Sequence, residues 1–379
     1  MDRSRVDTQD RLGILGSVKL LVNAAFVGDE PVGITRYMVR LAPRLAELTE
    51  VTLLTSNPQV FSNSGCKVVE LPRWTRGKLH RFYWEMTGLP RIISRDYDLI
   101  LSATHEVSPW PVLPTIAIVH DVIPLALHRS YSSKYKAYFW ATLQTLRWAA
   151  GIITDSHHTA RDLTRLRLVR AKRISVVYAG PGLEPADYSD ACPSELGPYI
   201  LYVGGHMPHK NIPRLIGAFK LLQTYRHMKL VLAGWGTEEH FIPTYEAIRR
   251  HALEHRVRVL RDPSDADLSN LYAGCSLFVF PSLYEGFGLP VLEAMTHGAP
   301  VACSSASSLP ELAGDAAVFF NPLSVTDIAA RMRALLDDTR LADALRHRGR
   351  ARAALFSWRE TARQIVEVAE SSCSGKPRW

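Results

Sequence analysis

Two carboxylates flank a glycine-bearing loop in the stretch PSLYEGFGLPVLEAMTHGAPV, residues 281–301. Glu285 lies in the loop with Gly286 and Gly288, and Glu293 follows in what we expect to be the first turn of a helix. Glycine lets backbone N–H groups approach an anion closely, and a helix N-terminus adds partial positive charge. Carboxylates accept hydrogen bonds from hydroxyl groups. The combination predicts a binding site for a phosphorylated sugar.

The elements on either side of this loop are indicated by the sequence. The apolar run CSLFVF, residues 275–280, predicts a buried strand. Pro290 suits the first turn of a helix and Gly298 its C-terminal end. A purely structural interpretation is also open, in which Glu293 complements the helix dipole and Glu285 is a solvated loop residue.

The full string resembles the E-x7-E motif of the retaining glycosyltransferases of family 4, which have the GT-B fold. The resemblance lies in the context S-x-Y-E-G-F-G-L-P-x-x-E-A-M. It implies that Glu285 contacts hydroxyl groups of the donor sugar and that Glu293 contacts the ribose of the nucleotide. It also implies that the loop backbone contacts the sugar and diphosphate, through Gly286, Phe287, Gly288 and Leu289.

Apolar runs alternate with helical patterns along the chain, which predicts βα units and parallel sheets. Strand candidates in the first half are SVKLLVNAAF, EVTLLT, DLILSA, TIAIVHD and AAGIITDS. Those in the second half are YILYVGG, MKLVLAGW, RVRVLRD, SLFVFP and PVACSS, with AVFF as a short edge strand. At 379 residues the chain fits two domains better than one. We therefore expect an α/β protein with two doubly wound sheets, and Pro43 should kink or interrupt the first helix.

The break between the domains is expected near residues 181–198, a stretch rich in proline, glycine and acidic residues. The family resemblance implies two Rossmann-like domains that face a cleft, and a C-terminal helix that crosses back to the first domain. The expected divisions are a mobile tail (1–16), an acceptor-binding domain (17–185), a nucleotide-sugar-binding domain (195–355) and a crossover helix with a tail (356–379).

A lysine follows the first strand of the second half, in the string HMPHKN. Lys210 would hold a diphosphate as a point charge at the start of a helix, or it is an ordinary exposed lysine. The string resembles the family's G-x-x-x-P-R-K-N pattern, whose lysine contacts the donor phosphates. His209 replaces the arginine of that pattern, and a neutral imidazole cannot replace a guanidinium fork at the diphosphate.

Two loops of the first half carry further candidates. His120 and Asp121 end the run TIAIVHD, and H-D-x-x-P resembles a motif of a mannosyltransferase-like branch of family 4. The resemblance places His120 beside the reacting sugar, and His120 would position and polarise that sugar. Asp121 would either orient His120 or bind the acceptor. Gly33, in VGITRY, resembles the family's glycine-rich loop that closes over the diphosphate and acceptor, although a lone glycine is more often simply a turn.

Other patterns favour structural roles. Asp265 and Asp267 form a D-x-D, a metal-binding pattern in some transferases, but SDADLSNLY is typical of a helix start. Ser308 and Glu311 fit a capping box. The chain has no G-x-x-x-x-G-K-[ST] and no G-x-G-x-x-G after its first strand, which disfavours P-loop kinases and dinucleotide enzymes. We expect neither a cofactor nor a metal ion.

The chain carries a formal charge of +8, which suits nucleic acid, an anionic membrane or a phosphorylated substrate. The segment PRWTRGKLHRFYWEM, residues 72–86, mixes cations with aromatic residues in a way that suits lipid headgroups, or it forms an ordinary solvated helix face. No RNA-binding motif is visible, so nucleic acid is not an expected partner. Five scattered cysteines and the absence of a membrane-spanning run favour the cytoplasm, with peripheral contact at the inner face of its membrane.

The sequence thus predicts a glycosyltransferase that moves a hexose from a nucleotide diphosphate sugar to a saccharide or polyprenyl-linked acceptor in surface polysaccharide synthesis. GDP-mannose is the first expected donor, followed by UDP-glucose or a deoxysugar donor. Retention and metal independence are implied by the resemblance, with Lys210 and helix N-termini stabilising the leaving diphosphate. The alternatives are a nucleotide-sugar 2-epimerase of the same fold and a non-catalytic nucleotide- or saccharide-binding module.

Overall fold

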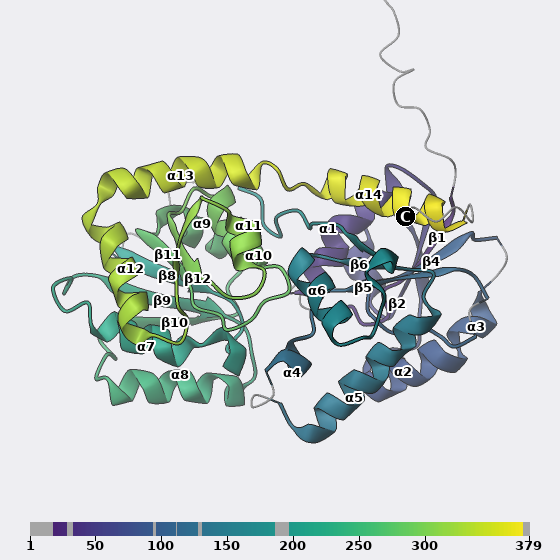
Figure 1. Ribbon diagram of the computed structural model, residues 1–379, viewed down its shortest axis with the longest axis horizontal. Coiled ribbons are helices and arrows are strands. Elements are labelled where there is room, and N and C mark those ends of the chain that lie inside the picture. Colours follow the sequence, from purple (N-terminus) through teal and green to yellow (C-terminus); the bar gives the residue numbers. More distant parts are fainter. Residues whose placement is uncertain are drawn as a thin grey trace, which may run out of the picture.

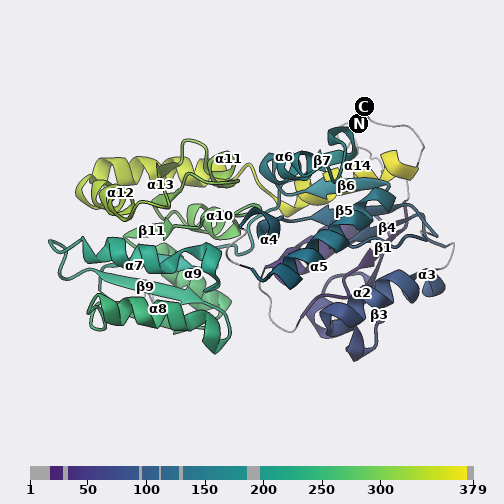
Figure 2. The same cartoon turned by 60° about the horizontal axis from the view of Figure 1, so that its bottom comes forward.

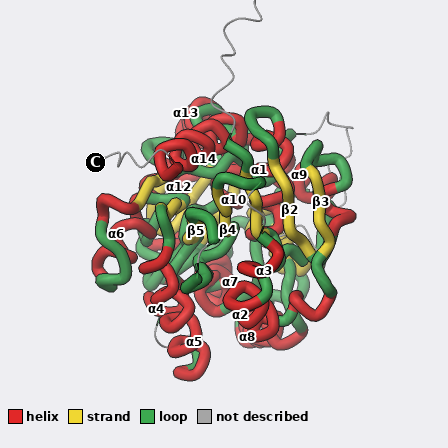
Figure 3. The backbone as a smooth tube through the Cα atoms, turned by 90° about the vertical axis from the view of Figure 1, so that its right-hand side faces the viewer, coloured by secondary structure: helices red, strands yellow, loops and turns green. Residues whose placement is uncertain are grey.

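The computed structural model describes residues 18–28, 33–93, 96–110, 112–127, 131–185 and 197–373. The chain forms two α/β domains that lie side by side, each built on a parallel sheet (Figure 1). Helices cover both faces of the sheets, as the views in Figure 2 and Figure 3 show. The expected N-terminal tail, residues 1–16, lies outside the described residues.

The first sheet has seven parallel strands in the order β3-β2-β1-β4-β5-β6-β7. The strands are β1 (Leu20–Asn23), β2 (Val51–Thr55), β3 (Lys67–Glu70), β4 (Leu99–Ser102), β5 (Thr115–Val119), β6 (Gly151–Thr154) and β7 (Ile174–Val176). The strand order reverses between β1 and β4, the kind of position where open α/β sheets bind ligands beyond the carboxyl ends of their strands. The five strands predicted in this half are confirmed.

The outer strands β3 and β7 were not predicted. Lys67 and Glu70 are exposed at the ends of β3, and the residues of β7 are only half-buried. Edge strands have a neighbour on one side only, so they need no continuous apolar run, and their sequences lack the pattern that marks the buried strands.

The helices of the first domain are α1 (Ile34–Ala46), α2 (Lys78–Thr87), α3 (Leu89–Ile92), α4 (Ile123–Ala126), α5 (Ser133–Leu143) and α6 (His157–Arg165). The expectation that Pro43 interrupts the first helix is wrong, because α1 continues through Pro43 and ends only at Ala46. Proline removes one backbone donor, so α1 lacks the hydrogen bond from position 43 to position 39, but the helix sustains this loss and continues for another turn.

The second sheet has six parallel strands in the order β10-β9-β8-β11-β12-β13. The strands are β8 (Tyr199–Val203), β9 (Lys229–Gly234), β10 (Val257–Arg261), β11 (Leu277–Phe280), β12 (Val301–Ser304) and β13 (Ala317–Phe320). The helices are α7 (Ile212–Lys220), α8 (Glu238–Arg250), α9 (Asp265–Gly274), α10 (Leu289–Thr296), α11 (Leu309–Ala313), α12 (Val325–Asp337) and α13 (Thr339–Ala353). All six strand predictions are confirmed, with β13 at the sheet edge, and the order reverses between β8 and β11.

The last helix, α14 (Trp358–Cys373), crosses back to the first domain and packs beside α1 (Figure 1). The Trp358 indole N–H donates to the Pro181 carbonyl oxygen over 2.7 Å, and the Trp358 ring contacts Tyr37 of α1 edge-on. This confirms the expected crossover helix. Residues 186–196 lie outside the described part of the chain, so the exact domain boundaries stay a prediction.

The largest apolar cluster runs through both domains and includes residues of α1, α10 and α14. Burial of this shared core holds the domains together. In the part of the chain that the structure describes, no helix combines the length and apolarity needed to cross a bilayer.

Candidate active site

The carboxylate loop lies where the sequence analysis expected it, between β11 and α10. Pro290 occupies the first turn of α10, which begins at Leu289 directly after Gly288. Gly288 has a φ of 113°, a conformation that a β-carbon would strain. The Ser308 hydroxyl fixes the loop, because it lies 3.0 Å from the Glu285 carbonyl oxygen and 2.9 Å from that of Phe287.

Gly286 lies against the backbone of the first domain. A β-carbon on Gly286 would come within 1.9 Å of the His120 carbonyl oxygen, so no larger residue fits. The Ser156 hydroxyl, at the start of α6, also donates to the Gly286 carbonyl oxygen over 2.6 Å. The two domains therefore touch directly at the loop that was expected to approach an anion.

Lys210 and Glu285 form a buried ion pair at the carboxyl end of the second sheet. Lys210 Nζ lies 2.8 Å from Glu285 Oε1 and 3.1 Å from Oε2, and both side chains are about nine-tenths buried. Lys210 Nζ also lies 5.3 Å from the centre of the Phe280 ring. Residues 75 positions apart are thus brought together because β8 and β11 are neighbours. The pair offers a cation for phosphate and a carboxylate for sugar hydroxyl groups.

His209 is buried next to this pair. Its Nδ1 lies 3.3 Å from the hydroxyl of Tyr131 in the first domain. Burial, together with the charge of Lys210, lowers the pKa of His209 to about 4. His209 is therefore neutral at physiological pH, so it cannot supply the positive charge of the arginine in the family pattern.

Glu293 is buried in the second turn of α10, one turn later than expected, and faces two polar groups. The Tyr272 hydroxyl donates to Glu293 Oε2 over 2.8 Å, and Glu293 Oε1 lies 3.9 Å from Arg36 Nη1 of the first domain. A β-carbon on Gly182 would come within 2.4 Å of Oε1, so backbone of the first domain approaches this carboxylate closely. Burial raises the pKa of Glu293 to about 7, against the opposing effects of Arg36 and Tyr272.

Arg36 is a site residue that the sequence analysis missed. It lies in the first turn of α1, three residues after Gly33, and its guanidinium bonds Asp265 over 2.7 Å as well as facing Glu293. Asp265 and Asp267 begin α9 as predicted, where Ser264 and Asp267 form a reciprocal cap. Gly33 itself is the N-terminal cap of α1 with a φ of 54°, and residues 29–32 of its loop lie outside the described residues.

His120 lies after β5 and is held by a second residue that the sequence analysis missed. Its Nδ1 lies 2.5 Å from Asp155 Oδ2, at the end of β6, and its Nε2 lies 3.3 Å from the Ala103 carbonyl oxygen. Burial disfavours the imidazolium, yet the charge and hydrogen bond of Asp155, assisted by Asp121, raise the pKa of His120 above its usual value. Both ring nitrogens face acceptors, which suits a charged, immobile imidazolium.

Asp155, and not Asp121, is therefore the carboxylate that orients His120. Asp121 Oδ1 accepts the backbone N–H of Ile123 over 2.9 Å, a contact that stabilises the turn before α4. Burial raises the pKa of Asp121, with Glu285 adding to the effect. Asp121 thus lies close enough to Glu285 for the two carboxyl groups to interact, and its role in acceptor binding stays a prediction.

The structure contradicts the expected capping box of Ser308 and Glu311. Ser308 and Glu311 do not form the predicted capping box, since the Ser308 hydroxyl is bound to the carboxylate loop. Instead the Glu311 carboxylate accepts the backbone N–H groups of His157 and His158 over 2.7 and 3.1 Å, at the start of α6 in the other domain. Glu311 therefore does bind helix N–H groups, but the helix that it stabilises belongs to the first domain.

The arrangement brings Lys210, Glu285, Glu293 and Gly286–Leu289 of the second domain together with Arg36, His120 and Asp121 of the first. Cations, carboxylates and the N-terminus of α10 gather where the two domains meet, a composition that suits a diphosphate joined to two polyhydroxyl groups. Among the described residues, no group of three or more His, Cys, Asp or Glu side chains is placed to hold a metal ion.

The chain matches known proteins over both domains. Residues 193–352 match the family described as glycosyl transferases group 1, and residues 31–183 match the one described as glycosyltransferase family 4. The chain is 31% identical over 372 residues to O-antigen chain mannosyltransferase B of Escherichia coli, covering 89% of this chain and 95% of that protein. It is 34% identical over 332 residues to the MMP alpha-(1->4)-mannosyltransferase of Mycolicibacterium hassiacum, covering 86% of this chain and 78% of that protein.

A solved structure of a sucrose-phosphate synthase from Thermosynechococcus elongatus superposes with a TM-score of 0.79 at 20% identity. The match covers 94% of this chain and 100% of that one. At this level of identity the likeness shows the two-domain fold alone.

Proposed function

The chain belongs to glycosyltransferase family 4, with the GT-B fold, and from this premise we propose that it transfers mannose from GDP-mannose to a hydroxyl group of a saccharide acceptor. The proposed acceptor is a free or polyprenyl-linked saccharide of a surface polysaccharide. The names of the relatives in Escherichia coli and Mycolicibacterium hassiacum support both the mannose and the saccharide.

The Lys210–Glu285 pair is the observation that carries the proposal. These two groups neutralise each other in a buried position. A nucleotide sugar would bind with its diphosphate at Lys210 and the α10 N-terminus, its sugar hydroxyl groups at Glu285 and its ribose at Glu293. The donor would then replace one buried ion pair with charge-assisted hydrogen bonds to each partner.

Transfer would proceed with retention at the anomeric carbon. The acceptor hydroxyl would attack on the face from which the diphosphate leaves, and a phosphate oxygen would take its proton. The engaged state of His120 supports this assignment, because an imidazole bonded to Asp155 and facing Ala103 has no nitrogen left to act as a base. The imidazolium would instead position and polarise the reacting sugar.

We propose that no metal ion is needed. Arg36, Lys210 and the N-terminus of α10 are positive groups already fixed at the cleft, and together they would stabilise the negative charge that develops on the leaving diphosphate. Closure of the domains around the donor would exclude water and limit its hydrolysis.

The test is turnover with a donor panel and a soluble acceptor. GDP-mannose, GDP-glucose and UDP-glucose are incubated with mannotriose, and the new linkage is identified by the anomeric proton and carbon couplings. An α-linked product from GDP-mannose is expected. A β-linked product would refute retention, and preference for UDP-glucose would refute the donor assignment. Conversion of the sugar nucleotide without acceptor would favour the 2-epimerase, and binding without turnover a non-catalytic module.

We further propose that the exposed face of the segment 73–83 contacts an anionic membrane at its inner surface. Trp74 is 48% exposed, Leu79 70% and Tyr83 65%. Two residues of the wider stretch 72–86 do not contribute, since Trp84 is buried and Arg81 faces Glu85 and Glu106 inside the domain. The remaining mixture of aromatic rings and cations suits lipid headgroups.

Liposome co-sedimentation tests this contact. Wild type should bind vesicles that contain anionic lipid, and the double variant Trp74→Ser, Tyr83→Ser should bind several-fold less. Trp140→Ser provides a matched control, because Trp140 is exposed on α5, outside the segment. Equal binding by all three proteins would contradict the proposal.

A further inference from the structure

Three tyrosines follow one another along one side of α5. Tyr131 lies just before the helix, Tyr135 in its first turn and Tyr138 one turn later, at spacings that place residues on one helix face. The Tyr131 and Tyr135 ring centres lie 5.7 Å apart and those of Tyr135 and Tyr138 6.4 Å apart, with the planes inclined by 28° and 29°. All three side chains are half-buried, so part of each ring stays open. We call this set the tyrosine ladder.

One end of the tyrosine ladder reaches the active site. The Tyr131 hydroxyl lies 3.3 Å from His209 Nδ1, and His209 directly precedes Lys210. Burial raises the pKa of Tyr131 to about 12, and the carboxylates of Asp121 and Glu285 contribute to the shift. The ladder therefore begins at the cleft, beside groups that we assign to the transferred sugar and the acceptor.

The other end meets a buried polar cluster between α2 and the loop after β4. Tyr138 packs edge-on against Phe82 of α2, with ring centres 6.3 Å apart. Arg81 Nη2 lies 3.4 Å from Glu106 Oε1, and Asn23 donates to Glu85 Oε1 over 3.0 Å. Burial, with the charge of Glu106, raises the pKa of Glu85 to about 8, so Glu85 is mostly protonated at neutral pH.

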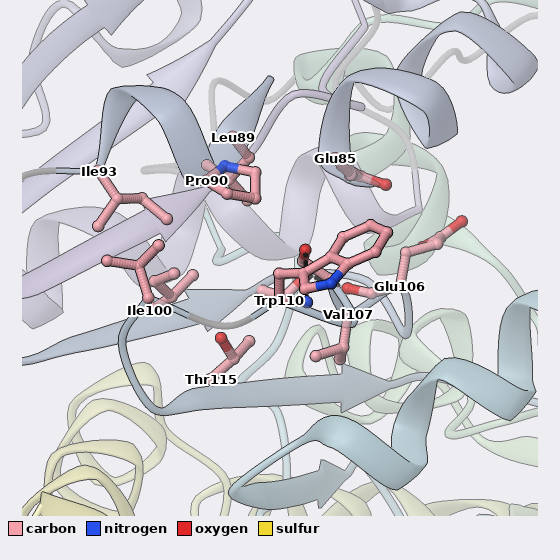
Figure 4. Close-up of a pocket in the computed structure, with 12 residues that line it drawn as sticks. Glu85, Leu89, Pro90, Ile93, Ile100, Glu106, Val107, Trp110 and Thr115 are labelled. Atoms are coloured by element: carbon pink, nitrogen blue, oxygen red, sulfur yellow. Dashed lines mark hydrogen bonds between the residues drawn. The ribbon is translucent and has the colours of Figure 1, made fainter. Parts of the chain in front are cut away.

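Four buried side-chain atoms of this end have no hydrogen-bond partner among the described residues: Arg81 Nε, Glu85 Oε2, Glu106 Oε2 and the Tyr138 hydroxyl. Glu85 is 1% exposed, and its Oε2 makes no hydrogen bond; the same holds for the buried hydroxyl oxygen of Tyr138. A small cavity of about 10 Å³, large enough for about one water molecule, is lined by Glu85 and Glu106. Figure 4 shows Trp110, Glu85 and Glu106 around it. Buried groups of this kind normally find partners, which points to a ligand rich in hydroxyl groups.

We propose that the tyrosine ladder and its polar end form an extended acceptor site for a saccharide of two or more sugar residues. The reacting residue would lie near Asp121 and Tyr131, and the following residues would pack on Tyr135 and Tyr138 and hydrogen-bond to Glu85 and Glu106. Rings of tyrosine offer an apolar face for the C–H side of a sugar and a hydroxyl for its polar side.

The chemistry of the surface favours a saccharide over a lipid chain. Glu85 Oε2, Glu106 Oε2 and the Tyr138 hydroxyl would stay without hydrogen-bond partners under a hydrocarbon, at a large cost in free energy. Sugar hydroxyl groups donate and accept, so they satisfy both the carboxyl groups and the tyrosine hydroxyls. The assignment rests on the proposed transferase function, because the proposed active site decides which end of the ladder holds the reacting sugar residue.

The test measures saccharide binding directly, by calorimetric titration of the full chain with mannotriose and with methyl α-mannoside in the presence of GDP. Wild type should bind mannotriose about tenfold more tightly than the monosaccharide, and Tyr135→Ala should lose about tenfold in affinity for mannotriose. Tyr135→Phe keeps the ring and should stay within about twofold of wild type. Trp140→Ala, on the same helix but outside the ladder, should bind as wild type does.

The melting temperature of each variant checks that it folds, and Tyr138→Ala provides a second ladder variant if Tyr135→Ala does not. Equal affinity for the two saccharides, no binding of mannotriose, or unchanged affinity in a folded ladder variant would overturn the extended site. Failure of the proposed transferase function looks different: mannotriose binding and its loss in Tyr135→Ala would persist, but no nucleotide sugar would be turned over.

Discussion

The two domains build their shares of the cleft differently. In the second domain, Glu285 and Glu293 lie on one continuous strand, loop and helix, and Lys210 joins them from the adjacent strand β8. In the first domain, Arg36, His120 and Asp155 follow three separate strands, and His120 meets Asp155 only because the sheet places β5 beside β6. The proposed donor contacts are therefore fixed locally, whereas the first-domain contacts depend on how the strands and the two domains pack.

This difference predicts that the most severe loss of activity follows from breaking the local donor site. Lys210→Met should lower kcat about 10²- to 10³-fold, because it removes a fixed charge that stabilises the leaving diphosphate. Measured kinetics with GDP-mannose check this, with Lys172→Met as an exposed control. A loss under tenfold would contradict the assignment.

Measurements of stability distinguish the catalytic role of Lys210 from its structural role as the partner of Glu285. Lys210→Met leaves the Glu285 carboxylate buried without its partner, so the melting temperature should fall. The double variant Lys210→Met, Glu285→Gln removes that charge and should recover stability while activity stays low. Recovery of both stability and activity would mean that Lys210 only stabilises the fold and has no role in catalysis.

The second prediction concerns the first domain. Asp155→Asn should lower kcat about 10- to 100-fold, because the imidazolium of His120 loses the carboxylate that holds and stabilises it. Nucleotide-induced shifts in melting temperature should be unaffected, since Asp155 lies outside the donor contacts. Equal losses in nucleotide binding and kcat would break the distinction between the domains.

The raised pKa of His120 also predicts the direction in which activity changes with pH. Asp155 raises the pKa of His120 in the folded protein, so the stabilising charge is present below the usual histidine pKa and is lost as pH rises through the raised value. Activity that needs the imidazolium should fall along this alkaline limb. In Asp155→Asn the limb should move to lower pH.

The sequence was most informative where a contact is local. The strand, loop and helix around Glu285 follow from an apolar run, two glycines and a proline within residues 275–298, so position and geometry are both visible. Arg36 bonds Asp265 across 229 positions, and no local pattern marks such a pair. Asp155 ends a predicted strand, but its contact with His120 requires knowing that β5 and β6 are neighbours.

Glu311 shows how a correct local pattern leads to a wrong partner. The spacing S-x-x-E is that of a capping box, yet the carboxylate caps a helix 154 positions earlier in the chain. Tertiary structure offered Glu311 two backbone donors at the start of α6, and its own helix α11 is only five residues long. Local propensity is a weak prior where another domain presents better donors.

The third prediction sharpens the donor assignment. Glu293→Gln should weaken GDP binding about tenfold, because the carboxylate accepts hydroxyl hydrogen bonds more strongly than an amide. Burial raises the pKa of Glu293 to about 7, so wild-type GDP affinity should fall as pH drops through 7 and the carboxylate is protonated. Titrations at pH 6 and pH 8 check this. A pH dependence that persists unchanged in Glu293→Gln would assign it to another group.

The smallest effect is expected at the contact between domains. Glu311→Ala removes the two hydrogen bonds that Glu311 adds to the Ser156 cap of α6, and should cost about 1–2 kcal/mol in free energy of unfolding. Asp338→Ala is a matched control, because Asp338 caps α13 through the Leu341 N–H within the second domain. Both variants should lose similar stability in denaturant titrations. Only Glu311→Ala should weaken closure, and it should therefore raise hydrolysis of the donor by water relative to transfer. If Asp338→Ala raises hydrolysis equally, the effect reflects general loosening, and the Glu311 contact does not help to close the cleft.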